Sequence, residues 1–398
     1  TTASLFLLAF ISVWSILKNP KYYFSARHPI FWQGLVCLLI PFSAEFLLQV
    51  VRQSIDGPNL DGPSRVFLAT FVFVYFSRLN CRALVNALSS GAAAGIITVG
   101  LSLIIFPEQY WGARAATYFV DPITLPSYLA ALLGIFLFVG FPWASVKVNL
   151  LFKLVATLIT LLVAIDSASR SSWIALALLM FCYFLFAFRG SLGKQIGGVL
   201  LVMFLCLTAY VINDSVQSRI DLALNVFLSF SSPSSEYHLR MLQTTSTGHR
   251  LLLALIDWEL ITRAPFLGVE DYAIPPFGEL VGKYPVITEK IYEIKLLAGS
   301  HSEFLAQIVR KGIIFGGLIV MSLFVFPAVL VSKATRFNPV ASSDAMKIIR
   351  GLTIPIFAAA LTIQVFNLKM TITFYALVLA LAFAKACNEV EIKKGNSC

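Results

Sequence analysis

Apolar stretches alternate with short polar joints along almost the whole chain. A helix needs roughly 20 predominantly apolar residues to cross a bilayer, and repeated stretches of about that length are typical of multi-pass helical membrane proteins. The pattern therefore predicts an all-α fold, a polytopic integral membrane helical bundle. We expect eleven spans, at residues 3–17, 30–51, 64–77, 84–106, 122–141, 148–165, 172–188, 196–212, 312–331, 348–366 and 371–385.

The composition agrees with this class, because 58% of the residues are hydrophobic and only 13% are charged. The formal net charge of +10 could indicate nucleic-acid binding, but the basic residues lie mostly in the short joints, and no basic helix is interleaved with stacking aromatic residues. We therefore exclude nucleic acid as a partner and expect the lipid bilayer instead. None of the six cysteines lies in the long polar segment, so neither a disulfide framework nor a thiolate metal site is expected.

Lysine and arginine concentrate in alternate joints, and this bias predicts the orientation of the spans. The opposite short joints hold only Arg52, Arg65, Arg114, Arg170 and Lys369. Because positively charged joints stay in the cytoplasm, the first span of the sequence enters from outside, and we expect a twelfth span before it in the full protein. The expected parts are residues 1–212 with eight spans, an outward-facing domain at 213–311, and residues 312–398 with three spans and a cytoplasmic tail.

The outward domain is the only long polar interruption in the chain, and we expect it to be partly helical. Its segments differ in their patterns: some have apolar residues at helical spacing, one is rich in Ser and Thr, and one contains clustered Pro and Gly. The expected elements are a surface helix over 213–230, a loop over 231–247, an amphipathic helix over 248–263, a lid over 273–299 and a short helix over 301–311.

His301 is the candidate general base of this domain. Ser300-x-x-Glu303 before an apolar run is the signature of a capping box, so Ser300 is expected at the N-cap and His301 in the first helical turn. The positive end of the helix dipole favours the neutral imidazole there, and a neutral imidazole accepts a proton near pH 7. The alternative interpretation is a histidine that only helps to cap a helix at the membrane interface.

Four arginines on the outward side are candidates for holding an anion. Arg250 begins the amphipathic helix, and its guanidinium suits a bidentate contact with phosphate, although such an arginine can equally contact solvent or lipid headgroups. Arg170 stands near the start of a helix, where a cation opposes the dipole, and it either binds an anion or pairs with Asp166. Arg65 and Arg114 stand alone in two other outward joints. Together the four would form a site for a polyanion such as a lipid pyrophosphate.

Two other polar residues are not assigned to the site, and two absent motifs argue against a metal-dependent or a hydrolytic mechanism. Glu45 lies inside a span, where a carboxylate is a functional candidate, yet it can equally pair with a neighbouring helix or face a wet crevice. His249 is interpreted as a residue that only extends the helix containing Arg250, and not as the base. The outward domain contains no Asp-x-Asp, so we expect no metal and no cofactor. The chain also lacks the Gly-x-Ser-x-Gly elbow of a Ser/His/Asp hydrolase.

Several motifs, taken together, resemble the O-antigen ligase and polymerase superfamily. They are Ser169-Arg170-Ser-Ser-Trp173, Gly248-His-Arg250 opening a helix through Trp258 to Pro265-x-x-Gly268, His301-Ser-Glu-Phe-Leu305 with Gly312 and Gly316, and the segment 114–122. The number of spans and the long outward loop before the late spans fit this family too. Ser302 departs from the pattern, because an asparagine commonly follows the histidine in relatives.

The resemblance implies a glycosyltransferase-C-like bundle in the bacterial inner membrane, with its active site on a periplasmic loop. It implies an O-antigen ligase, an inverting and metal-independent glycosyltransferase that moves O-antigen polysaccharide from undecaprenyl pyrophosphate to a sugar hydroxyl of lipid A-core. His301 would match the essential histidine of the family, and Arg170 and Arg250 its essential arginines. We expect Arg65 and Arg114 to contribute to binding the pyrophosphate or the glycan.

Three alternatives stay open. A polymerase of repeat units, or a protein O-oligosaccharyltransferase of the same superfamily, would use the same residues. A polysaccharide or lipid transporter belongs to a different class, but inverted repeats and paired broken helices are not evident in the sequence. A structural partner in an envelope complex is the third.

Overall fold

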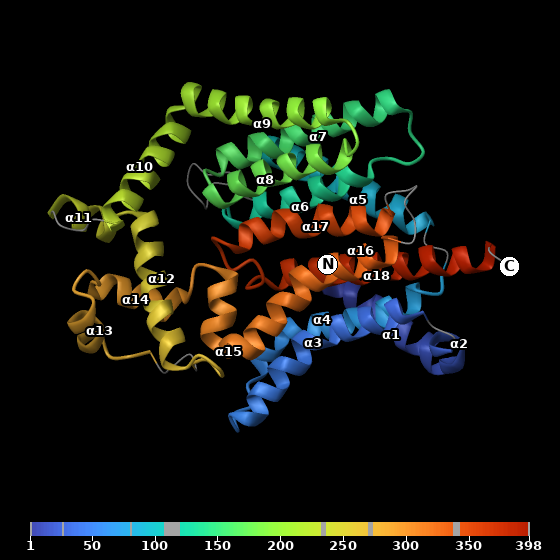
Figure 1. Ribbon diagram of the computed structural model, residues 1–398, viewed down its shortest axis with the longest axis horizontal. Helices are drawn as coiled ribbons and strands as arrows, with labels where there is room; N and C mark the ends of the chain where they lie inside the picture. Colours follow the sequence, from blue (N-terminus) through green and yellow to red (C-terminus); the bar gives the residue numbers. More distant parts are fainter. Residues whose placement is uncertain are drawn as a thin grey trace. The chain divides into compact units, whose positions relative to one another are not determined.

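The computed structural model describes residues 2–25, 28–79, 82–106, 120–231, 236–269, 274–336 and 343–396, and these residues are predominantly helical (Figure 1). The helices are α1 (Thr2–Lys18), α2 (Pro20–Phe24), α3 (Pro29–Val51), α4 (Gly57–Phe76), α5 (Arg82–Ile105), α6 (Thr124–Val139), α7 (Val146–Asp166), α8 (Arg170–Ala187), α9 (Leu192–Ile212), α10 (Asp214–Ser231), α11 (Glu236–Thr244), α12 (Ser246–Arg263), α13 (Phe277–Lys283), α14 (Glu289–Ala298), α15 (Glu303–Val320), the π-helical η1 (Met321–Val325), α16 (Phe326–Arg336), α17 (Asp344–Ala360) and α18 (Lys369–Asn396). The chain divides into two compact units. Unit 1 comprises Thr1–Val199, Ile319–Ala359 and Val365–Cys398, and unit 2 comprises Leu200–Leu318 and Ala360–Gln364.

The helical fold agrees with the sequence pattern, since each expected span falls wholly or mostly on helical residues. The span at 312–331 covers parts of α15, η1 and α16, and the span at 348–366 extends beyond the end of α17 at Ala360. Among the described residues, seven helical segments are long and apolar enough to cross a membrane: α3, most of α5, α7, α8, α9, Glu303–Lys333 and most of α18. The helices α1 and α6 are apolar but shorter. The count of eleven spans, the twelfth span and the outward orientation of the loop therefore stay predictions.

Unit 1 contains two groups of packed helices. In the first, α4 packs against α1, α3 and α18, and the rings of Phe31, Phe73 and Phe383 meet in its core. In the second, α6 packs against α5, α7 and α8. The backbones of α6 and α17 also touch, because a Cβ atom on Gly134 would lie only 3.1 Å from the Cα atom of Gly351. Small residues at such a crossing allow membrane helices to approach closely.

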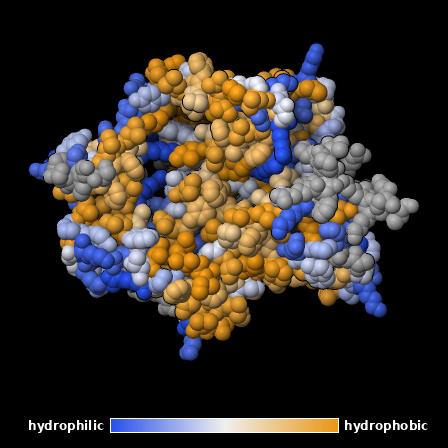
Figure 2. All heavy atoms as spheres, viewed as in Figure 1, coloured by the Kyte–Doolittle hydropathy of each residue, from blue (hydrophilic) through white to orange (hydrophobic). Residues whose placement is uncertain are grey.

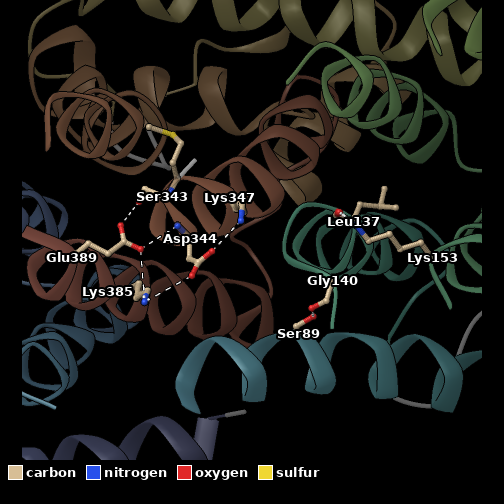
Figure 3. A network of polar contacts seen from close by, with 10 residues as sticks. Ser89, Leu137, Gly140, Lys153, Ser343, Asp344, Lys347, Lys385 and Glu389 are labelled. Carbon is tan, nitrogen blue, oxygen red and sulfur yellow. Dashed lines mark hydrogen bonds and ion pairs between the residues drawn. The ribbon is translucent and has the colours of Figure 1, made fainter. Parts of the chain in front are cut away.

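A polar network connects α17 to α18 within unit 1 (Figure 3). Lys385 lies 3.8 Å from a carboxylate oxygen of both Asp344 and Glu389, and the backbone N–H of Asp344 donates to Glu389 at 3.0 Å. Lys347 pairs with the other oxygen of Asp344 at 3.0 Å. These residues belong to the joint and the tail that the charge pattern assigns to the cytoplasm. The network therefore connects the first turn of α17 to the later part of α18.

Apolar side chains cover much of the surface shown in Figure 2. On α7, Leu150, Leu154, Leu158 and Leu162 are each between 52% and 60% exposed. Residues four apart lie on one face of a helix, so these leucines form an exposed apolar row. Monomeric soluble proteins rarely expose a large apolar surface, whereas a helix in contact with acyl chains requires one. The row therefore supports a multi-pass membrane protein.

Unit 2 contains a separate hydrophobic core. Its fully or nearly fully buried residues are Val226, Leu242, Leu252, Leu253, Ile256, Leu260, Leu280, Ile287, Ile291 and Val309. The helices α10 and α12 confirm the two helices expected in this region. The loop expected over 231–247 is partly wrong, because α11 forms there and buries Leu242. The segment interpreted as a lid contains α13 and α14, which contribute Leu280 and Ile291 to the same core.

The helix α15 is interrupted at Gly312. This residue has φ 70° and ψ 173°, a conformation that is essentially restricted to glycine. The turn after α12 uses the backbone groups at the interruption: the N–H of Ile313 donates to the carbonyl of Pro265 at 2.7 Å, and the N–H of Val269 donates to that of Val309 at 2.8 Å. The short helix that the sequence predicts before Gly312 is thus confirmed.

Candidate active site

His301 lies in a short irregular turn between α14 and α15, and we call residues 299–302 the His301 turn. The helix α14 ends before Gly299, which has a φ of 67°, and α15 begins at Glu303. The expectation that His301 occupies the first helical turn is therefore wrong. Because regular helical hydrogen bonds do not fix this segment, the position of His301 depends on the contacts of its neighbours.

Ser300 is not the N-cap of α15, contrary to the sequence expectation. The carbonyl of Ser302 accepts the first hydrogen bond of the helix, from the N–H of Ala306 at 2.9 Å. The hydroxyl of Ser300 donates instead to Oδ1 of Asp257 at 2.8 Å. The capping-box pattern failed because a buried carboxylate from another helix binds the serine that would otherwise cap α15.

A second segment of unit 2, the turn 360–364, holds the His301 turn from another direction. Three hydrogen bonds connect the two segments: Gln364 Nε2 to the carbonyl of Ser300, the hydroxyl of Ser302 to the carbonyl of Ala360 (3.1 Å), and the N–H of Glu303 to the carbonyl of Ile363 (3.2 Å). The residues on both sides of His301 are therefore fixed by contacts with other parts of the unit.

The imidazole of His301 is half-buried and has the properties of a proton acceptor. In the part of the chain that the structure describes, it makes no hydrogen bond to another protein group. Burial lowers its pKa below the ordinary value, and the nearby positive charges of Arg250 and Lys295 lower it further, while Asp257 opposes them. The ring is therefore neutral at pH 7 and can accept a proton. The expected neutrality thus has a different source, namely burial and neighbouring cations.

Arg250 and His249 belong to the first turns of α12 in the same unit. Thr245 caps this helix, since its hydroxyl accepts from the N–H of Gly248 at 3.1 Å. The half-buried Arg250 is close enough to His301 to act on it electrostatically. Nε2 of His249 lies 2.8 Å from a backbone carbonyl oxygen, that of Gln243, and a carbonyl can only accept. Nε2 of His249 therefore carries a proton.

Sequence reasoning missed Asp257 and Lys295, which lie beside His301. They form an ion pair with side chains only 1% and 3% exposed. The available signal was the position of Asp257 directly after the apolar run Leu251–Ile256 of α12, seven residues after Arg250. Residues seven apart share one face of a helix, so Asp257 and Arg250 lie on the same side of α12.

The other candidate residues lie in unit 1 or outside the described residues. Arg170 is the half-buried first residue of α8. Arg65 is 5% exposed, and its guanidinium donates to Asp61 at 3.0 Å and to Thr373 at 3.0 Å. Glu45 is also buried, and it accepts a hydrogen bond from a side-chain amide of the same helix at 2.9 Å. Arg114 lies outside the described residues.

Among the described residues, no group of three or more histidine, cysteine, aspartate or glutamate side chains could hold a metal ion. The neighbouring carboxylates Glu270 and Asp271 are not among those residues.

The fold and the surface define a multi-pass helical membrane protein whose second unit places a neutral histidine near an arginine. Residues 155–321 match the model of the O-antigen ligase family. The match confirms the resemblance drawn from the motifs, and it includes Arg170, Arg250 and His301 but not Arg65 or Arg114. No curated protein matches the chain. The family supports a glycosyltransferase-like activity of the ligase or polymerase type on lipid-linked glycans.

Proposed function

We propose that the protein transfers O-antigen polysaccharide from undecaprenyl pyrophosphate to a sugar hydroxyl of lipid A-core, at the periplasmic face of the bacterial inner membrane. One observation carries the proposal. The imidazole of His301 has a lowered pKa, is under the electrostatic influence of Arg250, and lies inside the segment that matches the O-antigen ligase family. This combination provides a proton acceptor next to a cation that suits a pyrophosphate.

The proposed reaction is a single displacement at the anomeric carbon of the donor sugar. His301 takes the proton of the acceptor hydroxyl while the hydroxyl oxygen forms the new glycosidic bond. The bond from the anomeric carbon to the pyrophosphate oxygen breaks on the opposite face, so the configuration inverts. Undecaprenyl pyrophosphate leaves with the bonding electron pair, and the imidazolium later releases its proton to solvent. The step requires no metal in this proposal.

Arg250 is proposed to stabilise the leaving pyrophosphate, because a guanidinium can bind two phosphate oxygens and the negative charge grows during the reaction. The same cation lowers the pKa of His301, so it also keeps the base neutral before the reaction. Arg170 is proposed to stabilise the same leaving group, on the grounds of its chemistry and its place in the matched segment. Arg65 and Arg114 stay candidates for binding the donor, although Arg65 would have to exchange its bond to Asp61.

A transfer assay with purified protein, lipid-linked glycan and lipid A-core tests this proposal. We expect His301→Ala to lower the rate by about 10²–10⁴-fold, which is the usual contribution of a general base. Arg250→Ala should lower it by about 10²–10³-fold through loss of a charged donor. Arg240→Ala removes an exposed arginine of the same unit and should leave the rate unchanged. Full transfer by His301→Ala would refute the proposal.

The pH dependence of the rate provides a second test. Only the neutral imidazole can accept the proton, so the rate should fall as the pH drops through the pKa of His301. Because burial and Arg250 lower this pKa, the midpoint is expected below the ordinary histidine value of about 6.5. A midpoint well above that value would contradict the assignment of His301 as the base.

The acceptor distinguishes the alternatives within the family. A polymerase should extend a second lipid-linked unit in place of lipid A-core, and a protein O-oligosaccharyltransferase should require a polypeptide acceptor. A transporter, in contrast, should move its lipid substrate equally well after His301→Ala.

A further inference from the structure

A buried ion pair is bonded to the turn that carries His301. Asp257 of α12 and Lys295 of α14 form this pair, and both side chains are almost completely buried. The ammonium group of Lys295 also donates to the hydroxyl of Ser300 at 3.0 Å, and that hydroxyl donates to Asp257 at 2.8 Å. The three side chains therefore form a closed network that ends at the residue next to His301.

Stability alone does not explain this pair. Removing two charges from water costs several kcal/mol for each ion, and a well-packed apolar pair is often as stable or more stable. Another ion pair of unit 2 shows the less costly arrangement: Lys283 binds the buried Glu259 at 2.6 Å while its own side chain remains 58% exposed. Lys295 has no such exposure. A fully buried pair beside a proposed base is a candidate for a role in the chemistry.

We propose that Asp257 and Lys295 are positioning residues for His301, which fix the His301 turn through Ser300 and place two opposing charges beside the imidazole. This inference rests on the proposed function of His301 as the base. Neither residue has to contact the substrate. Their effect is transmitted by the hydrogen bonds to Ser300 and by electrostatic interaction.

Charged groups from every element around the His301 turn enter this balance. Arg250, His249 and Asp257 from α12 and Lys295 from α14 act on His301 electrostatically. The helix α15 adds Glu303 and Arg310, and the Arg310 guanidinium lies 3.4 Å from the Cβ position of Gly299 in the His301 turn, while the turn 360–364 presents the neutral Gln364. Glu303 accepts a hydrogen bond from the next turn of its own helix at 2.7 Å. Burial lowers the pKa of His301 most, Lys295 and the other cations add to the effect, and Asp257 raises it. The two members of the pair therefore act on His301 in opposite directions.

Asp257 also retains an unused acceptor. Oδ1 receives the hydrogen bonds of Lys295 and Ser300, whereas Oδ2 is buried and has no hydrogen-bond partner among the described residues. An unsatisfied buried oxygen is unfavourable in the resting protein. Its negative charge becomes favourable when His301 takes a proton, because the imidazolium is positive. Asp257 is thus expected to stabilise the protonated form, while Lys295 limits that effect before the reaction.

Histidine ring resonances, followed by NMR in nanodiscs without substrate, test the electrostatic part of the proposal. Asp257→Asn should shift the titration midpoint of His301 to lower pH, and Lys295→Met should shift it to higher pH. The same variants should transfer glycan up to about 100-fold more slowly, because a displaced catalytic group costs about that much. Ser300→Ala should slow transfer while leaving the titration midpoint in place.

The pair Glu259–Lys283 provides the matched control, since it connects α12 to α13 and, among the described residues, makes no hydrogen bond to the His301 turn. Glu259→Gln and Lys283→Met should leave the titration of His301 unchanged even where they lower stability. The double variant Asp257→Asn with Lys295→Met removes both charges together, which a fold tolerates better than removal of one. It should titrate close to the parent and transfer faster than either single variant.

The outcomes are separable. Shifts of His301 in the same direction, or no shift in either single variant, would overturn the proposal about the pair. Because the titration is read without substrate, it does not depend on the reaction. Opposite shifts together with full transfer by His301→Ala would support the electrostatic role of the pair but refute the proposed function.

Discussion

The substitution Gly312→Ala tests the link between the interruption of α15 and the stability of unit 2. With φ 70° and ψ 173°, Gly312 occupies backbone space that an alanine adopts only with strain. A Cβ atom at this position would also lie 2.6 Å from the backbone nitrogen of Leu267, in the turn that follows α12. Both effects act on the contact between that turn and α15.

The magnitude follows from these two effects. A residue held in such a region of backbone space costs roughly 1–3 kcal/mol. The methyl group also collides with backbone atoms, which cannot rotate away as a side chain can, and forced overpacking typically costs a further ~1–3 kcal/mol. We therefore expect Gly312→Ala to lower the free energy of unfolding by at least about 2 kcal/mol. A loss of this size is a large part of the stability of an ordinary domain.

Gly317→Ala is the matched control, because Gly317 belongs to the same helix and nothing lies within 4 Å of its Cβ position. Alanine is the better helix former by about 1 kcal/mol, so this variant should be as stable as the parent or more so. The unfolding midpoint of both variants in detergent micelles, followed by tryptophan fluorescence, gives the comparison. Equal midpoints for the two variants would refute the assigned conformation of Gly312.

Three further predictions concern other contacts. Thr245→Ala removes the side chain that caps α12 at 3.1 Å and should lower the free energy of unfolding, measured by denaturant titration, by about 1 kcal/mol. Glu259→Gln removes the negative charge and one of the two acceptor oxygens from a carboxylate that accepts three hydrogen bonds. The pKa of Glu259 is lowered chiefly because Lys283 donates to it. The stability that the Glu259 carboxylate contributes is therefore fully present above the unfolded-state pKa of about 4.3, and it is lost as the pH falls through the lower folded-state pKa. The unfolding midpoints of parent and variant should therefore converge at low pH. A constant difference between the two midpoints down to pH 2 would contradict this. Gly134→Ala drives a methyl group into the backbone of α17 and should lower stability by roughly 1–3 kcal/mol, whereas Gly91→Ala, which meets open space, should leave the thermal midpoint unchanged.

The positions of the helices could largely be predicted, because lipid contact and burial both require long apolar runs. The helix α11 could not. Its sequence is polar and follows a Ser-rich stretch, and local composition therefore favoured a loop. The helix forms because Leu242 becomes buried in the core of unit 2, and this tertiary contact outweighs the weak local preference. The helix packs against its chain neighbours α10 and α12, and local composition does not record this packing.

In the candidate site, too, the sequence predicted features that depend on local patterns but not contacts between distant residues. The sequence placed His301 and Arg250 in one domain, and the structure finds them in one unit. It did not indicate that Lys295 pairs with Asp257, because the two residues are 38 positions apart and each stands in an ordinary helical context. Single charged residues in amphipathic helices are usually exposed. Only the packing of α14 against α12 makes this pair buried.

The location of His301 outside the helix changes what controls its chemistry. A histidine in the first turn of α15 would owe its neutral state to the dipole of its own helix, which acts over about one turn. That effect would not depend on the residues of α12 and α14. In the observed turn, burial comes first and the charges of Arg250, Asp257 and Lys295 follow, and all three side chains belong to other helices. The proton affinity of the proposed base therefore depends on the packing of α12 against α14. Any movement that separates these two helices would change the pKa of His301 and the surroundings of the proposed anion site at Arg250 together.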